Sequence, residues 1–223
     1  KACELRLRHK DKESLPIFEK LLVADSNQVG YLTNVSNCYS VVGNEKKDEK
    51  ERMKYFNSAA YLSEKAIMLN PEEADAHYTY AQALGRINEF ASPKQQVASA
   101  KVIKTETEKA IALDPKISGA HHIMGRWHRT VAGFGPVEKL AINMLFGGVP
   151  EGGSNEAAVE SFQKAIKAEP KYILHIYELA NTYYEMKNIP FAKAWLKKAM
   201  EITADCEDDV DALKKCEELK KKL

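Results

Sequence analysis

Residues 109–115 read KAIALDP, and close copies of this stretch recur along the chain. The copies are KAIMLNP at 65–71, KAIKAEP at 164–170 and a more divergent KAMEITA at 198–204. The alanines of these stretches are separated by 44, 55 and 34 residues. A spacing of about 34 residues is the period of the tetratricopeptide repeat. The two longer spacings indicate the same repeat with insertions.

The last copy matches the tetratricopeptide pattern of large and small residues at fixed offsets over two paired helices. The matching positions are Ile176, Leu179, Ala180, Tyr183, Ala192, Leu196 and Ala199. The alanines allow the two helices to approach each other closely. Each earlier copy ends in proline, which cannot continue a helix because it lacks a backbone N–H. The pattern predicts an all-α, tetratricopeptide-like helical solenoid.

We expect a single tetratricopeptide-like domain over the whole chain. Its segments are a partial repeat at 1–28, repeats at about 29–71, 72–115, 116–170 and 171–204, and a capping helix at 205–223. The insertions at 44–52 and 89–99 are expected to lengthen the second helices, and Ser92 before Pro93 is a helix start signal. A solenoid needs a cap over its last repeat. The residues expected to form that cover are Val210, Leu213, Cys216 and Leu219.

The insertion at 133–154 contains a short helix that is apolar on nearly every side. One face carries Val137, Leu140, Ala141, Met144 and Leu145, and Ile142 and Phe146 widen the apolar sector. Such a helix is expected to be buried, most simply against its own solenoid. The alternatives are a lid over a hydrophobic cavity, or a contact with lipid or with a partner. The lid residues would be Val137, Leu140, Met144, Leu145 and Phe146.

The first helices of the repeats are expected to line a groove that binds a ligand. The candidate groove residues are Asn37, Tyr78, Gln82, His122, Arg126, Arg129, Tyr177, Asn181 and Tyr184. This mixture of aromatic and polar side chains suits an extended peptide or an acidic head group, with Arg126 and Arg129 pairing with carboxylate or phosphate. The alternative is that these arginines pair with nearby glutamates such as Glu138 or Glu160 and bind nothing.

The composition and motifs exclude several classes of function. The chain has 33 Lys and Arg against 32 Asp and Glu, a formal net charge of +1, so bulk attraction to nucleic acid is not expected. The chain contains no run of about 18 apolar residues, so no transmembrane segment is predicted. His121, His122 and His128 cluster, but no carboxylate or cysteine pattern completes a metal site. Without a phosphate-binding loop or a nucleophile–histidine arrangement, we predict a non-enzyme with no cofactor and no metal.

Three segments together resemble a known family: HHIMGRWHR, VEKLAINMLFGG and AKAWLKKAMEI. The residues that carry the resemblance are Gly125, Arg126, Trp127, Glu138, Lys139, Ala192, Trp195, Lys198 and Ala199. Over most of residues 55–203 the chain is similar to the regulator of microtubule dynamics protein family, and it looks like a short, soluble member. The resemblance implies a microtubule-associated protein of the cytoplasm and cytoskeleton. It implies action at the spindle and spindle poles during chromosome segregation, with microtubules, tubulin and other spindle proteins as partners.

Binding to the acidic surface of tubulin requires a basic patch. The main candidates are Lys214, Lys215, Lys220, Lys221 and Lys222, and further basic residues near the start are Arg6, Arg8 and Lys10. The alternative is that the terminal lysines only form a solvent-exposed helix face that binds nothing. Two other functions stay open. One is a phospholipid carrier with a cavity under the 137–146 helix, which a membrane-anchored member of the family implies. The other is a peptide-binding adaptor that uses the groove.

Overall fold

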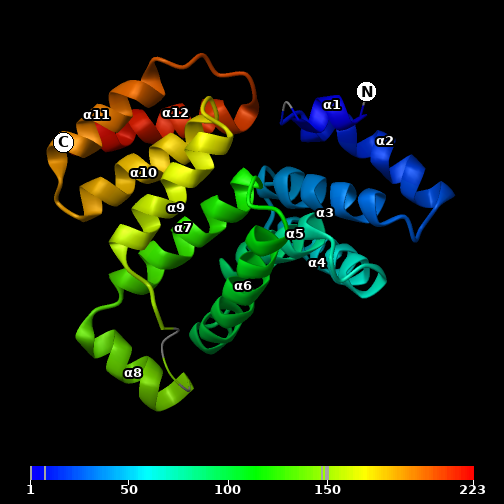
Figure 1. Cartoon of the computed structure of the whole chain (residues 1–223), viewed down its shortest axis with the longest axis horizontal. Helices are drawn as coiled ribbons and strands as arrows, with labels where there is room; N and C mark the ends of the chain where they lie inside the picture. The colour runs from blue at the N-terminus through cyan, green and yellow to red at the C-terminus, as the bar shows by residue number, and fades with distance from the viewer. Residues whose placement is uncertain (1, 8, 147, 149–150) are drawn as a thin grey trace. The chain divides into compact units, whose positions relative to one another are not determined.

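The computed structural model describes residues 2–7, 9–146, 148 and 151–223, and this part of the chain forms helices and no strand (Figure 1). The helices are α1 (Ala2–Leu7), α2 (Asp11–Ala24), α3 (Val29–Asn44), α4 (Glu49–Leu69), α5 (Ala74–Asn88), α6 (Pro93–Leu113), α7 (Ser118–Gly133), α8 (Pro136–Phe146), α9 (Asn155–Ala168), α10 (Ile173–Glu185), α11 (Ile189–Met200) and α12 (Glu207–Lys220). Helix pairs α3/α4, α5/α6, α7/α9 and α10/α11 pack against each other. The predicted all-α, tetratricopeptide-like class is confirmed.

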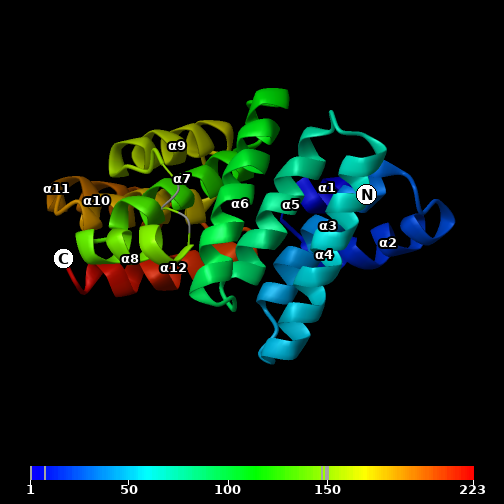
Figure 2. The ribbon, with the colours of Figure 1, turned by 90° about the horizontal axis from the view of Figure 1, so that it is seen from below.

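Contacts divide the chain into two compact units. The first contains α1 to α6, and the second contains α7, α8 as far as Met144, and α9 to α12. In the first unit, α3 packs on α2, α4 and α5, as Figure 2 shows for α3 and α4. Phe18 from α2 and Val35 and Cys38 from α3 form one buried cluster of that unit.

The second helices of the first unit are long, as the sequence predicts. α4 and α6 have 21 residues each, whereas α11 in the last repeat has 12. Asp48 starts α4 by accepting a hydrogen bond from the Glu51 amide at 2.9 Å. Ser92, directly before Pro93, forms a capping box with Gln95 in the first turn, which confirms the predicted start of α6. The charged insertion at 44–52 therefore covers the last residue of α3, the connecting turn and the first turn of α4.

The second unit has its core between α9, α10, α11 and α12. Phe162, Ile176, Leu179, Leu196 and Leu219 are among the buried residues of this cluster. The side chains of four residues of α12 are buried, namely Asp209, Ala212, Cys216 and Leu219. The prediction for Val210 is wrong, because that side chain is 46% exposed. The sequence analysis missed Asp209, whose carboxylate accepts a hydrogen bond from the Ile173 amide at 2.9 Å and so caps α10.

The prediction that α8 is buried is wrong for most of its described apolar side chains, although Ile142 is partly buried. Val137 is 80% exposed, Leu140 60% and Met144 76%. The side chains of Leu145 and Phe146 lie outside the described part, as does Arg8. The helix begins after Gly135, whose amide donates to the Glu138 carboxylate at 2.6 Å. An apolar composition predicts burial only when some element covers the helix, and no described helix packs on α8.

Candidate functional site

The first helix of the last repeat presents aromatic and amide side chains on one face. Tyr177, Asn181 and Tyr184 follow one another at helical spacing on α10, and none is fully buried. The Lys215 ammonium, from α12, lies 6.0 Å from the centroid of the Tyr177 ring. The Lys187 ammonium lies 5.6 Å from the centroid of the Tyr184 ring. We call these five residues the α10 face, which combines aromatic rings with cations.

The two lysines of the α10 face have no carboxylate partner among the residues that the structure describes. Asn181 donates a hydrogen bond from Nδ2 to Oε1 of Glu185 at 2.8 Å. Burial raises the pKa of the Tyr177 phenol, and the nearby Glu178 acts in the same direction. The phenol therefore stays protonated at neutral pH and can act as a hydrogen-bond donor.

Arg129 on α7 is paired inside the fold rather than aimed at a ligand. Its Nη2 lies 2.5 Å from Oε2 of Glu178, and its Nε lies 3.7 Å from Oε2 of Glu185. Its Nη1 also donates to the Glu178 carbonyl at 3.1 Å. The alternative of internal glutamate partners therefore holds for Arg129, although the partners are neither Glu138 nor Glu160. Arg126, one turn earlier, is exposed and makes no ion pair within the described ranges.

His122, on α7, packs inside the second unit against residues of α9 and α10. Its ring stands edge-on to the Phe162 ring, with centroids 5.7 Å apart. Its Nδ1 is 2.9 Å from Nδ1 of His175, and the other ring nitrogen of His175 is 3.4 Å from a Glu169 carboxylate oxygen. His121 is buried, 7% exposed, as expected for a core histidine. Within the described ranges, no group of three or more His, Cys, Asp or Glu side chains is arranged to hold a metal ion.

The candidate groove residues of the first unit do not form an open site. Asn37 is buried, and its Nδ2 donates to the Asp11 carboxylate of α2 at 3.0 Å. Asn37 is therefore a structural residue, and its prediction as a ligand contact is wrong. Tyr78 and Gln82 are half-buried on α5, and Gln82 Nε2 donates to the Tyr78 hydroxyl at 3.2 Å. The reason for the error at Asn37 is that α2 covers this part of α3.

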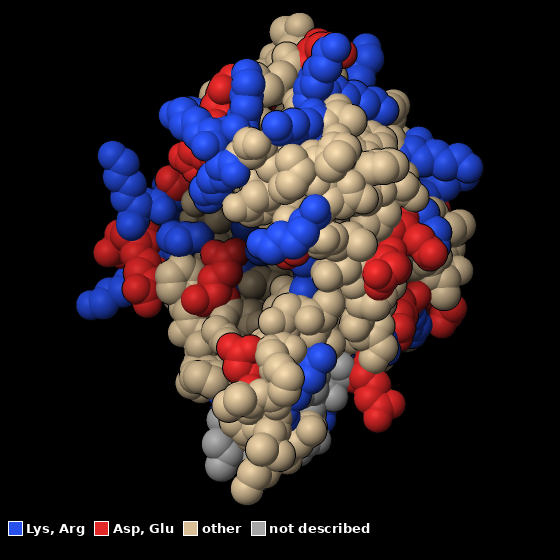
Figure 3. Space-filling view, turned by 90° about the vertical axis from the view of Figure 1, so that its left-hand side faces the viewer, with Lys and Arg blue, Asp and Glu red and all other residues tan. Residues whose placement is uncertain are grey.

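The candidate basic patch is exposed but interleaved with acidic residues. Lys214 forms an ion pair with Asp211 at 2.8 Å, whereas Lys220, Lys221 and Lys222 are exposed. The acidic residues of the same helix are Glu207, Asp208, Asp209, Asp211, Glu217 and Glu218. Figure 3 shows Lys and Arg side chains alternating with Asp and Glu side chains on the side of the molecule that it displays. No uniformly basic helix face is therefore present on α12.

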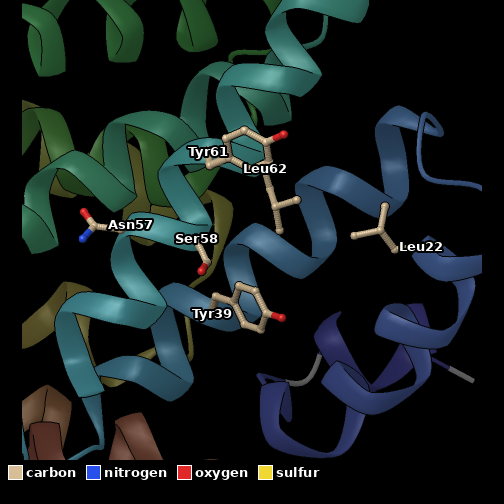
Figure 4. Close-up of a pocket in the computed structure, with 6 residues that line it drawn as sticks. All are labelled: Leu22, Tyr39, Asn57, Ser58, Tyr61 and Leu62. Atoms are coloured by element: carbon tan, nitrogen blue, oxygen red, sulfur yellow. The ribbon is translucent and has the colours of Figure 1, made fainter. Parts of the chain in front are cut away.

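A surface hollow in the first unit was not predicted from the sequence. It lies between α2 and α4 over α3 and has a volume of about 430 Å³ (Figure 4). Its lining residues are Leu22, Tyr39, Asn57, Ser58, Tyr61 and Leu62. We call it the α2–α4 groove. The signal that could have found it is Tyr61, a large aromatic residue at a solvent-facing position of α4.

No helix in the described part of the chain is both long enough and apolar enough to cross a membrane.

Solved structures with a similar fold are tetratricopeptide proteins. A thermophilic tetratricopeptide protein of Thermus thermophilus superimposes with a TM-score of 0.66, at 16% identity, over 97% of this chain and 94% of that chain. MamA superimposes with a TM-score of 0.52, at 20% identity, over 90% of this chain and 92% of that one. At such low identity the likeness supports the fold alone.

Relatives of known sequence carry one family name. Bovine regulator of microtubule dynamics protein 1 is 30% identical over 210 residues, which are 94% of this chain and 62% of that protein. Human regulator of microtubule dynamics protein 1 is 29% identical over 163 residues, 73% of this chain and 51% of that protein. Bovine regulator of microtubule dynamics protein 3 is 30% identical over 200 residues, 89% of this chain and 42% of that protein. The chain thus spans less than two thirds of the length of these relatives.

The family model described as regulator of microtubule dynamics protein 1-3 matches residues 2–223. Because this match extends over nearly the whole chain, the chain belongs to the regulator of microtubule dynamics protein 1-3 family.

Proposed function

We propose that this chain is a non-catalytic, microtubule-associated protein that acts on microtubule dynamics, and on chromosome segregation at the spindle and its poles. The observation that carries the proposal is the family match over residues 2–223. The tetratricopeptide-like fold supports it, because stacked helix pairs present extended surfaces to protein partners. The proposed partners are microtubules and other spindle proteins, and the proposed location is the cytoplasm and cytoskeleton.

The α10 face is the proposed contact with tubulin. Its two lysines and Arg126 on α7 have no carboxylate partner in the described structure. Acidic chain segments, such as those on the tubulin surface, would supply the missing negative charge. The aromatic rings of Tyr177 and Tyr184 add apolar area beside these charges. The exposed lysines 220–222 would extend the basic surface, although the acidic residues of α12 weaken it.

Co-sedimentation with polymerised tubulin across a salt series tests the proposal. We expect pelleting that decreases steadily as salt rises, because screening weakens contacts between exposed charges. Replacing Lys187 and Lys215 with Glu should weaken binding at least tenfold. The matched control replaces Lys193 and Lys197 of α11 with Glu, which makes the same change of charge elsewhere in the same unit. Absence of pelleting at low salt, or equal losses in both variants, would contradict a contact at the α10 face.

Lipid binding is a second candidate, and the exposed apolar side chains of α8 favour it. Moving a large apolar side chain such as Leu140 or Met144 from water into a lipid interface lowers the free energy of the system. Flotation of the protein with phosphatidylcholine vesicles tests this function. We expect flotation that is lost when Leu140 and Met144 are both replaced by Gln. Flotation that is unchanged in the double variant would exclude α8 as the lipid contact.

A further inference from the structure

The α2–α4 groove belongs to the first unit, and the proposed microtubule contact lies in the second. The apolar part of the groove is formed by Leu22 of α2 and by Tyr61 and Leu62 of α4. Figure 4 shows Leu22 and Leu62 facing each other across the gap between the two helices, with the Tyr39 ring at its floor. Tyr61 is 65% exposed, whereas Leu22 and Leu62 are partly buried against the core of the first unit. A large apolar side chain is costly to leave in water, so the exposed Tyr61 ring beside these two leucines indicates a contact surface.

The groove also carries polar groups without partners. The side chains of Asn57 and Ser58 line it and form no hydrogen bond within the described chain. The Tyr39 hydroxyl, in contrast, donates to Oε1 of Glu19 at 2.7 Å, which fixes that ring at the floor. An amide and a hydroxyl beside an apolar hollow can bind the backbone N–H and C=O groups of an extended peptide.

The α4 side of the groove carries two exposed lysines, although Glu51 and Glu64 of the same helix are acidic. Lys54 precedes Asn57 and Ser58 by one helical turn, and Lys50 precedes Lys54 by another, so all four share one side of α4. Both lysines are exposed, and neither has a carboxylate partner among the residues that the structure describes. Lys46, in the turn before α4, is already paired with Glu51 at 3.0 Å. Two unpaired cations beside the groove favour an occupant with carboxylates at one end.

We propose that the α2–α4 groove binds an extended acidic peptide segment that carries one bulky apolar side chain. The apolar side chain occupies the hollow between Leu22 and Leu62 and packs against the Tyr61 ring. The peptide backbone forms hydrogen bonds with Asn57 and Ser58. The acidic residues that follow lie along α4 toward Lys54 and Lys50. This site is independent of the proposed microtubule contact, so the two proposals can fail separately.

Fluorescence polarisation with the full chain tests the proposal. The first probe is a labelled ten-residue peptide of Ser, Gly and one central Leu, followed by three Glu. Its two controls carry Ser in place of Leu, or Lys in place of each Glu. We expect saturable binding of the first probe and binding at least tenfold weaker for each control. No saturable signal at a protein concentration of about 1 mM, or equal binding of all three peptides, overturns the proposal.

Substitutions locate the peptide on the surface. Tyr61→Ala and the pair Lys50→Glu and Lys54→Glu should each weaken binding of the first probe at least tenfold. All three side chains are solvent-facing on α4, so these changes should leave the urea midpoint unaltered. The matched control is Val102→Ala with Lys94→Glu, exposed positions of α6 in the same unit. Equal losses in the control overturn the assignment. A concentration-dependent dimer that Tyr61→Ala abolishes would also overturn it and identify a second copy of the chain as the occupant.

Discussion

His122 on α7 and His175 on α10 face each other with their Nδ1 atoms 2.9 Å apart. A hydrogen bond between two imidazole nitrogens needs one N–H donor and one unprotonated acceptor. The contact therefore joins α7 to α10 inside the second unit. The groups around His175 are the Glu169 carboxylate at 3.4 Å and the edge-on Tyr172 ring, whose hydroxyl donates to Asp208.

We predict that His122→Ala destabilises the second unit. The substitution removes the ring that stands edge-on to the buried Phe162 ring and takes a hydrogen-bond partner from His175, a residue only 2% exposed. The loss should be about 1–3 kcal/mol, the usual cost of removing the partner of a buried polar group. Urea unfolding followed by tryptophan fluorescence measures it, because both tryptophans, Trp127 and Trp195, lie in the second unit. An unchanged free energy of unfolding in the His122→Ala variant would contradict the role of the pair.

We predict that Arg129→Met strongly destabilises the second unit. The substitution leaves the Glu178 carboxylate, a residue only 7% exposed, without its partner at 2.5 Å. Removing one member of a buried ion pair costs about 3–5 kcal/mol. Urea unfolding measures the change. Glu185→Gln is the control, because its side chain is 45% exposed and its contact with Arg129 is longer, 3.7 Å. Equal effects of the two substitutions would argue against a special role of Glu178.

We predict opposite effects of two glycine substitutions in first helices. A Cβ atom at Gly125 would lie 2.7 Å from the Phe162 ring, which is fully buried. Gly125→Ala should therefore destabilise the protein by about 1–3 kcal/mol. A Cβ atom at Gly85 meets nothing within 4 Å, so Gly85→Ala should stabilise α5 by about 0.5–1 kcal/mol. Thermal unfolding of both variants measures whether each substitution raises or lowers the stability. Destabilisation of equal size in the two variants would disprove the packing argument.

We predict slow reaction of three of the four thiols with a disulfide reagent at pH 8. Burial raises the pKa of Cys38 and of Cys206 to about 12 and that of Cys216 to about 11. Few thiolate ions therefore form at those sites, whereas Cys3 is exposed and should react first. The thiols contribute stability below the unfolded pKa of about 8.5. Because the folded pKa is raised, this stability is lost as pH increases from there toward 11–12. Three fast-reacting thiols would contradict the prediction.

We predict that the exposed residues of α8 contribute little to folding. Leu140→Ala and Met144→Ala should each change the free energy of unfolding by less than about 0.5 kcal/mol, because these side chains bury little area. Leu179→Ala in the fully buried core of the same unit is the comparison and should cost about 2–5 kcal/mol. A loss above about 1 kcal/mol for Leu140→Ala would indicate that α8 packs on another element.

Much of the helical architecture was predictable because its signals are local. The KAIxLxP stretches end in proline, so they mark the ends of second helices at Leu69 and Leu113 within about one residue. The start of α6 is also marked locally. The Ser92 side chain caps the helix, and the Pro93 ring restricts the backbone of the first helical residue. The short helix α1 was not predicted, because no repeated pattern marks it.

Most candidate binding residues could not be assigned from the sequence because their partners are distant in the chain. Arg129 and Glu178 are 49 residues apart, and Asn37 and Asp11 are 26 apart. Helical periodicity shows which face of its helix carries each side chain. It does not show whether another helix covers that face. The α2–α4 groove combines residues from three helices, so no local pattern could predict it.

The sequence by itself determined the repeat, the lengthened second helices and the family, since these depend on spacing and on local backbone chemistry. The tertiary structure alone decided which polar side chains are internal, which charges stay unpaired and where apolar residues remain exposed. Leu140 and Leu179 illustrate the difference: both lie in apolar helical segments, yet one is 60% exposed and the other fully buried. The reason is that burial depends on the neighbouring helices that cover a side chain, and only the folded chain brings those helices together.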